Sequence, residues 1–158
     1  MRWSEIDLDK GTWTIPAARL KNGAKTGRAH ELPLPDMALE ILQTIPRGSR
    51  DQLFGEHSRG FTSWAGGKRE LDARSGVTGW TVHDIRRSVA TGMANRGVAP
   101  HAIEAVLNHV SGTRAGVSGI YNRSTYEPEK RAALILWADH VAALVGGERK
   151  VLAFKPSA

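Results

Sequence analysis

The 158-residue sequence contains no cysteine. Disulfide bonds, thiolate zinc sites and cysteine nucleophiles are therefore excluded. The sequence also lacks an apolar run long enough to span a bilayer, because its longest, Ala132–Val145, is interrupted by Asp139 and His140. Met1 leads directly into charged residues, and no signal peptide is recognisable. We therefore expect a cytoplasmic protein that has no membrane partner.

The patterns of common metal sites are missing as well. No pair of carboxylates stands at the spacing typical of nucleases, and the His-x-x-x-His pattern does not occur. The sequence therefore predicts no metal ion and no other cofactor. If the protein cleaves a phosphodiester, it must use cationic side chains and a side-chain nucleophile.

The composition is that of a folded protein, with 41% hydrophobic and 24% charged residues. The length suits one domain with a real core. The net charge is +6, and the cations are segregated from the carboxylates. A basic balance suggests a polyanionic partner, and this segregation is what a one-sided phosphate-binding face needs. The cations lie in two groups, which are Lys10, Arg19, Lys21, Lys25 and Arg28, and then Arg86, Arg87 and Arg96.

Local patterns predict an α+β fold that is mainly helical, with a small antiparallel sheet on its N-terminal side. Thr12–Pro16 and Ala29–Leu34 read as two strands of a β-hairpin with a long cationic tip. A further short strand is expected at Gln52–Phe54. Periodicity and capping signals predict five helices. These are Asp36–Ile45 with Asp36 as its cap, a weak Thr62–Arg74, Thr81–Asn95 with Thr81 as its cap, Pro100–His109, and Glu127–Val145.

Two helix ends carry candidate functional residues. His83 and Arg86 are spaced i, i+3 in the first turn of a helix, so both point the same way. A helix N-terminus binds phosphate, and a guanidinium there adds bidentate contacts. The helices Thr81–Asn95 and Pro100–His109 form a helical hairpin. His109 ends the second of these helices and could approach His83 and Arg86. The plainer interpretations are a solvated basic helix start and a histidine that stabilises a helix C-terminus.

Tyr121 follows a glycine-rich link, Ser111–Gly119. A tyrosine on such a link can be a nucleophile, or it can simply anchor the chain in the core. The sequence alone leaves both interpretations open. Four other histidines, at 30, 57, 101 and 140, have no partner at a helpful spacing and are interpreted as structural or exposed.

Several short motifs together resemble those of the tyrosine recombinase (phage integrase) family. No single motif is specific, but five of them occur in the family's order, and the resemblance extends to about Val145. The motifs are Arg2–Asp7, the hairpin end His30–Leu34, His83–Ser88, Val106–His109 and Ile120–Arg123.

The resemblance implies a set of catalytic residues. The nucleophile is Tyr121, twelve residues after His109, and Tyr126 is the fallback. His83, Arg86 and His109 stabilise the charged transition state. Lys25 protonates the leaving oxygen, although Lys21 fits better when counted from the first strand.

The resemblance also implies a reaction. The tyrosine attacks a phosphorus of double-stranded DNA, and a 3′-phosphotyrosyl link and a free 5′-hydroxyl result. Neither metal nor ATP is required, because the covalent link conserves the bond energy. The function implied is site-specific recombination, in which the full-length protein self-associates as a tetrameric synapse on DNA.

One expected feature is missing. The family has a further catalytic arginine, in a Gly-x-Arg-x-x-Glu setting, a few residues before the segment that matches Trp3. The amino-terminal DNA-binding domain typical of the family is missing too. We therefore expect residues 1–158 to be one domain truncated at its N-terminus, with a core of residues 1–145 and a tail of residues 146–158, and impaired in catalysis by itself.

A competing hypothesis needs no chemistry. Val89–His109 contains two helices joined by a glycine-containing turn, which could be a helix-turn-helix module that reads a major groove. It gives no role to Tyr121 or to the cationic hairpin. A basic globular domain without a nucleic-acid role is the remaining alternative.

Overall fold

A computed structural model describes residues 1–21, 23, 27–55, 60–109 and 124–146. A three-stranded antiparallel sheet in the order β1-β2-β3 forms its N-terminal part. The strands are β1 (Ile6–Asp7), β2 (Thr12–Ile15) and β3 (His30–Pro33), and two short 3-10 turns, η1 (Trp3–Glu5) and η2 (Ala17–Arg19), accompany them.

The register of the sheet confirms the predicted hairpin. In β2, Trp13 lies opposite Leu32 of β3 and opposite Ile6 of β1. Strand β1 was not predicted, because two residues are too few to show an alternating pattern. The strand expected at Gln52–Phe54 is reduced to a single bridge between Arg2 and Gln52.

The predicted helices are all present in the structure. Asp36 is the first residue of its helix and not the cap, a position that Pro35 takes. Another difference is that the helix expected to end at His109 already ends at Val106. The helices are α2 (Asp36–Gln43), α3 (Trp64–Ser75), α4 (Val82–Ala94), α5 (Pro100–Val106) and α7 (Glu127–Gly146).

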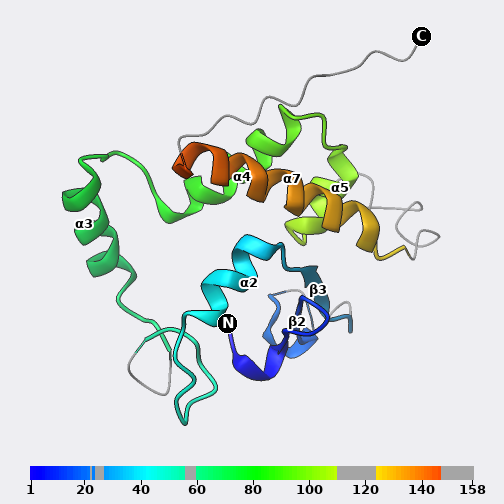
Figure 1. The fold of residues 1–158 in the computed structure, drawn as a ribbon, viewed down its shortest axis with the longest axis horizontal. Helices are drawn as coiled ribbons and strands as arrows, with labels where there is room; N and C mark the ends of the chain where they lie inside the picture. The colour runs from blue at the N-terminus through cyan, green and yellow to red at the C-terminus, as the bar shows by residue number, and fades with distance from the viewer. Residues whose placement is uncertain (22, 24–26, 56–59, 110–123, 147–158) are drawn as a thin grey trace.

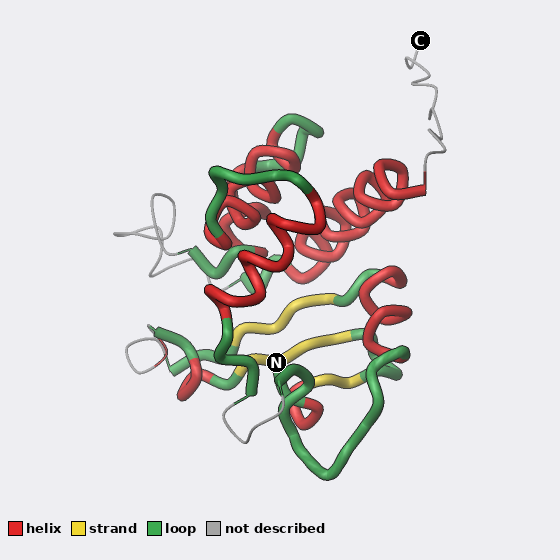
Figure 2. The backbone as a smooth tube through the Cα atoms, turned by 90° about the vertical axis from the view of Figure 1, so that its left-hand side faces the viewer, coloured by secondary structure: helices red, strands yellow, loops and turns green. Residues whose placement is uncertain are grey.

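The core lies where α4, α5 and α7 meet. Met93 of α4 is fully buried, and Ile103, Val106 and Ala133 surround it. Leu32 of β3 packs against this cluster, so the sheet contributes to the same core. Figures 1 and 2 show the sheet and α2 on one side and α4, α5 and α7 on the other.

Close contact between α4 and α7 depends on one glycine. A Cβ atom added to Gly92 would lie 2.2 Å from Cζ3 of Trp137. Non-bonded carbon atoms do not approach that closely. Only glycine at this position therefore lets the indole ring of α7 lie against the α4 backbone. Arg96 stacks over the same ring, 6.0 Å from its centroid, and contacts His140 as well.

A buried carboxylate joins the N-terminal segment to the sheet. Glu5 accepts hydrogen bonds from the Arg19 guanidinium, from Trp13 Nε1 at 3.2 Å and from the Arg2 amide at 3.2 Å. Burial raises the pKa of Glu5, but the hydrogen bonds from Arg19 and Trp13 outweigh this and hold that pKa below its usual value. Glu5 is therefore a charged anchor of the sheet.

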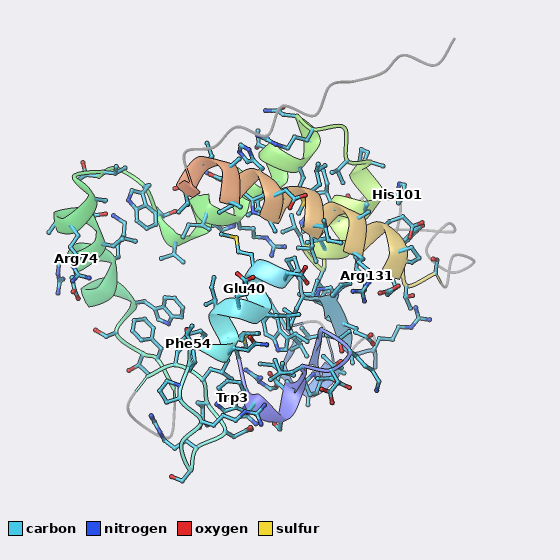
Figure 3. The ribbon with its side chains drawn as sticks, viewed as in Figure 1. Trp3, Glu40, Phe54, Arg74, His101 and Arg131 are labelled. Carbon is cyan, nitrogen blue, oxygen red and sulfur yellow. The ribbon has the colours of Figure 1, made fainter. Side chains whose placement is uncertain are left out.

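Helix α3 lies apart from the core. None of its twelve residues, all of them described, is buried. Figure 3 shows Arg74 on its outer side, far from His101 and Arg131 on the main helical layer. Among the helices that the structure describes, none is both long and apolar enough to cross a membrane.

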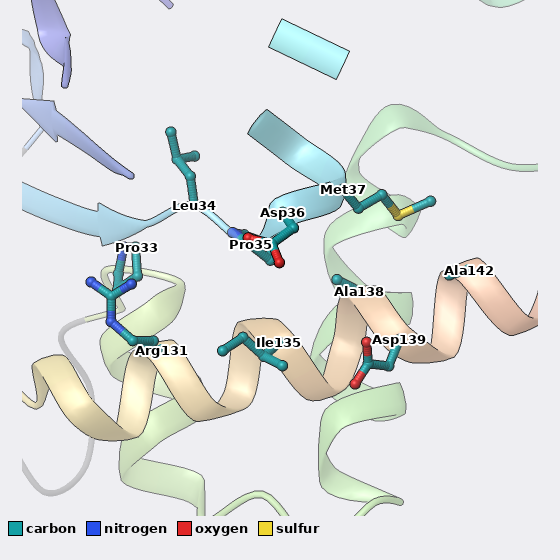
Figure 4. Close-up of a pocket in the computed structure, with 10 residues that line it drawn as sticks. All are labelled: Pro33, Leu34, Pro35, Asp36, Met37, Arg131, Ile135, Ala138, Asp139 and Ala142. Carbon is teal, nitrogen blue, oxygen red and sulfur yellow. The ribbon is translucent and has the colours of Figure 1, made fainter. Parts of the chain in front are cut away.

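A shallow groove of about 180 Å³ lies between the β3–α2 connection and α7 (Figure 4). Its walls are Pro33–Met37 on one side and Arg131, Ile135, Ala138, Asp139 and Ala142 on the other. No candidate catalytic residue lines it, so it is separate from the site described next.

Candidate functional site

The start of α4 is fixed by a capping box, as the Thr81 signal predicted. The Asp84 carboxylate accepts from the Thr81 amide at 2.8 Å and from the Thr81 hydroxyl at 2.7 Å. These bonds, followed by one from Arg87 at 3.2 Å, hold the pKa of Asp84 below its usual value. These contacts fix the start of α4, and the side chains of His83 and Arg86, which follow the cap, are exposed.

Arg86 links α4 to the end of α5. Its Nη2 atom donates a hydrogen bond to the main-chain oxygen of Leu107 at 2.5 Å. Leu107 is the C-cap of α5 and lies two residues before His109. The structure therefore brings Arg86 close to the segment that carries His109, as the sequence analysis expected.

His109 lies just beyond α5 in a Schellman motif. Asn108 has a φ of 50°, in the left-handed region. Its amide donates to the Ala105 oxygen at 3.4 Å, and the His109 amide donates to the Glu104 oxygen at 2.9 Å. His109 is thus not the helix-terminal residue that the sequence predicted. It is fixed by its own backbone, with an exposed side chain.

Two further basic side chains approach this region, His30, which the sequence analysis interpreted as structural or exposed, and Lys130, which it did not single out. His30 Nε2 lies 3.2 Å from the main-chain oxygen of Val106. Lys130 is only 4% exposed, and its Nζ donates to the Glu31 oxygen at 2.5 Å. A signal for Lys130 existed, because it stands four residues before Leu134 on the buried face of α7.

The remaining candidates are placed only in part. Tyr121 and Lys25 lie outside the described residues, and Lys21 is exposed just after η2. Tyr126 is half-buried, and its ring lies 5.0 Å from that of His101. His101 is in the first turn of α5, at the opposite end of that helix from His109. Tyr126 therefore packs against α5 away from the histidine and arginine cluster.

Three of the cations predicted for the basic face make contacts within the fold. Lys10 pairs with Asp7 at 3.1 Å, and Arg19 pairs with the buried Glu5. Arg96 lies at the other end of α4 from Arg86 and donates to the Gly92 oxygen at 2.8 Å. These three cations have structural partners. Of the predicted cations that the structure describes, Lys21, Arg28, Arg86 and Arg87 have exposed side chains near the hairpin and the α4 start.

The described part of the chain contains no group of three histidine, aspartate or glutamate side chains that could hold a metal ion. The site residues that the structure describes are one guanidinium, of Arg86, and two imidazoles, of His83 and His109, and all three side chains are exposed. Such groups can contact the oxygens of a phosphate through several N–H donors at once.

Known proteins are similar to this chain over most of its length. The model of the phage integrase family matches residues 1–127. The chain belongs to that family. It is 36% identical over 150 residues to the prophage integrase IntA of Escherichia coli K12, with 92% of this chain and 35% of the relative covered. It is 29% identical to the tyrosine recombinase XerA of Pyrococcus furiosus, with 94% and 51% covered.

The integrase of enterobacteria phage P4 is 27% identical over 158 residues, with 89% of this chain and 35% of the relative covered. The chain thus spans between about a third and a half of the length of these relatives. No solved structure matches it with comparable significance.

Proposed function

We propose that this family member is the C-terminal part of a tyrosine recombinase that breaks and rejoins DNA strands at specific sites. Tyr121 attacks the phosphorus, forms a 3′-phosphotyrosyl bond and displaces the 5′-oxygen. Lys25, or Lys21 in the other hairpin register, gives that oxygen a proton. His83, Arg86 and His109 stabilise the charge on the phosphoryl oxygens. No metal ion or other cofactor takes part.

The observation that carries this proposal is the Arg86–Leu107 contact. It joins the start of α4, which carries His83 and Arg86, to Leu107, two residues before His109, and so supports a site that combines residues 23 or more positions apart in sequence. A guanidinium has five N–H donors, so one bond to a carbonyl is compatible with a bidentate contact to a phosphate. All three side chains are exposed, as a site for a polymeric substrate requires.

The helix-turn-helix hypothesis is disfavoured by the burial of α5. Ala102, Ile103, Ala105 and Val106 are buried against the other helices, which leaves α5 little surface for a major groove. Tyr126 is also a poor nucleophile, because its ring packs against His101. The family relationship supports the recombinase alternative.

The domain boundaries and the biological setting belong to the same proposal. The relatives are two to three times longer than this chain, which supports a longer protein that supplies the missing arginine. Double-stranded DNA in the cytoplasm is the proposed substrate. Four protomers would assemble on it in a synapse, and residues 146–158 would form the tail.

Covalent trapping on a nicked DNA substrate in the longer protein tests the proposal. Tyr121→Phe keeps the ring but removes the attacking oxygen, so we expect no adduct and normal DNA binding. Tyr126→Phe is the matched control and should trap normally. Trapping by Tyr121→Phe would disprove the assignment of the nucleophile.

A substrate with sulfur in place of the leaving 5′-oxygen tests the general acid. Sulfur leaves readily without a proton, so it should restore cleavage to Lys25→Ala and not to Tyr121→Phe. Rescue of Lys21→Ala instead would shift the hairpin register by four residues. Rescue of neither lysine variant would place the general acid elsewhere, with His83 as the next candidate.

A further inference from the structure

Four successive main-chain oxygens at the C-terminal end of α5 accept hydrogen bonds. The oxygens of Glu104 and Ala105 accept from the amides of the Schellman motif, at 2.9 and 3.4 Å. The next two oxygens accept from side chains of other elements, Val106 from His30 and Leu107 from Arg86. The last carbonyls of a helix carry partial negative charge and favour such donors.

These two side chains act from different parts of the fold. Arg86 belongs to α4 and is a candidate contact to phosphate, whereas His30 is the first residue of β3. His30 is half-buried and lies 76 positions from Val106 in sequence, so its contact is a long-range tie between the sheet and the helical layer. Without His30, Arg86 would be the one remaining side-chain donor described for this end of α5.

The strand that carries His30 is itself anchored. The next residue, Glu31, accepts through its main-chain oxygen from Lys130, whose side chain is almost entirely buried. Burial of an ammonium is costly unless its donors are satisfied, so this contact stabilises one position of β3 against α7. The His30 ring is therefore presented to α5 from a fixed base.

We propose that His30 is a positioning residue for the phosphate-binding cluster, a role that rests on the function proposed above. By donating to the Val106 oxygen, His30 holds the end of α5 in place. Arg86 then does not hold that end of α5 alone, and His109 keeps its position relative to Arg86. His30 itself contacts neither the DNA nor the reacting atoms.

The test compares His30 variants in covalent trapping with the longer protein. His30→Leu removes both ring nitrogens, and we expect the trapping rate to fall about 10- to 100-fold, the usual cost of a small misplacement of catalytic groups. DNA affinity should change little, because phosphate contacts over the whole site dominate it. His30→Gln keeps an N–H donor near the position of Nε2 and should recover most of the rate.

A sulfur leaving group distinguishes this role from an effect on the hairpin lysine. If His30 positions the cluster, the sulfur substrate will not rescue His30→Leu, although it rescues Lys25→Ala. Rescue of His30→Leu by sulfur would overturn the proposal, and so would equal rates for the leucine, glutamine and wild-type proteins. Should His30→Leu not fold, His30→Asn takes its place, because its amide is too short to reach Val106.

Two controls complete the experiment. His140→Leu removes a half-buried histidine at the other end of the helical layer, where it contacts Arg96, and should trap at the wild-type rate. If His140→Leu lowered the trapping rate as much as His30→Leu does, the effect would be a general loss of stability, and the proposal would be overturned.

Tyr121→Phe is the second control and is included throughout. If that variant still forms the adduct, the proposed function fails, whereas a wild-type rate in His30→Leu beside an inactive Tyr121→Phe refutes the positioning role alone.

Discussion

The guanidinium of Arg86 donates to the main-chain oxygen of Leu107 at 2.5 Å, across 21 positions of sequence. This bond closes the hairpin formed by α4 and α5 on the side of the candidate site. Under the proposed function this one side chain has two tasks, to fix the end of α5 and to present donors to a phosphate. A substitution at Arg86 should affect both, and the predictions below separate structural from chemical effects.

Gly92→Ala should destabilise the fold by about 1–3 kcal/mol, although alanine favours helices. The new methyl group would lie 2.2 Å from Trp137, so the indole ring or the whole of α7 must move. Thermal unfolding measures the change. Gly146→Ala, in a helix end with open space around it, is the control and should be close to neutral. Equal unfolding temperatures for the two variants would show that α4 and α7 do not pack this tightly.

Local structure was largely predictable from the sequence. The Thr81 cap and the helix that carries His83 and Arg86 depend on neighbours along the chain, and the structure confirms the cap and the helix. The hairpin of Thr12–Ile15 with His30–Pro33 is confirmed too, because alternation and turn residues are local signals as well.

Long-range contacts were not predictable in the same way. The bond between His30 and Val106 joins residues 76 positions apart, and that between Lys130 and Glu31 joins residues 99 apart. No periodicity encodes such pairs. Lys130 is buried, contrary to the general preference of lysine for the surface, so residue type alone does not predict its position. Tyr121 and Lys25 lie outside the described residues, and their roles rest on the family relationship.

The capping box at the start of α4 should make stability depend on pH. The pKa of Asp84 is lowered in the folded chain, so its contribution is fully present above the ordinary value of 3.8 and is lost as the pH falls through the folded pKa. Asp84→Asn keeps an oxygen acceptor for Thr81 but no charge. The unfolding temperatures of wild type and variant should therefore differ at neutral pH, and they should converge only as the pH falls from 3.8 toward the lower pKa of the folded chain. A constant difference from neutral to acid pH would contradict the assigned role.

The 158-residue chain should bind duplex DNA weakly and with little sequence preference. Its exposed cations act through phosphates, so the affinity should fall steeply as the salt concentration rises. The same chain should cleave poorly, since loss of one transition-state donor costs about 10²–10³ in rate and the family's further arginine is not in this sequence. A salt titration followed by fluorescence anisotropy, together with a nicked-substrate assay, measures both. Salt-insensitive binding or efficient cleavage would contradict these expectations.

Arg86 and the adjacent Arg87 offer a matched pair for the chemistry. Arg87 bonds to Asp84 at 3.2 Å and takes part in the start of α4, whereas Arg86 points to the end of α5. Lysine keeps the charge but lacks the planar fork, so it cannot bond to the Leu107 oxygen and hold a phosphate in two contacts at once.

Arg86→Lys should therefore slow covalent trapping in the longer protein by about 10²–10³, the usual cost of one lost transition-state donor. Arg87→Lys should leave the rate nearly unchanged, because a lysine there can still pair with Asp84. Both variants keep the net charge, so equal DNA affinity would show that the difference arises in the chemical step. If both variants were slowed equally, the effect would belong to the basic helix start as a whole, and Arg86 would have no special place in the site.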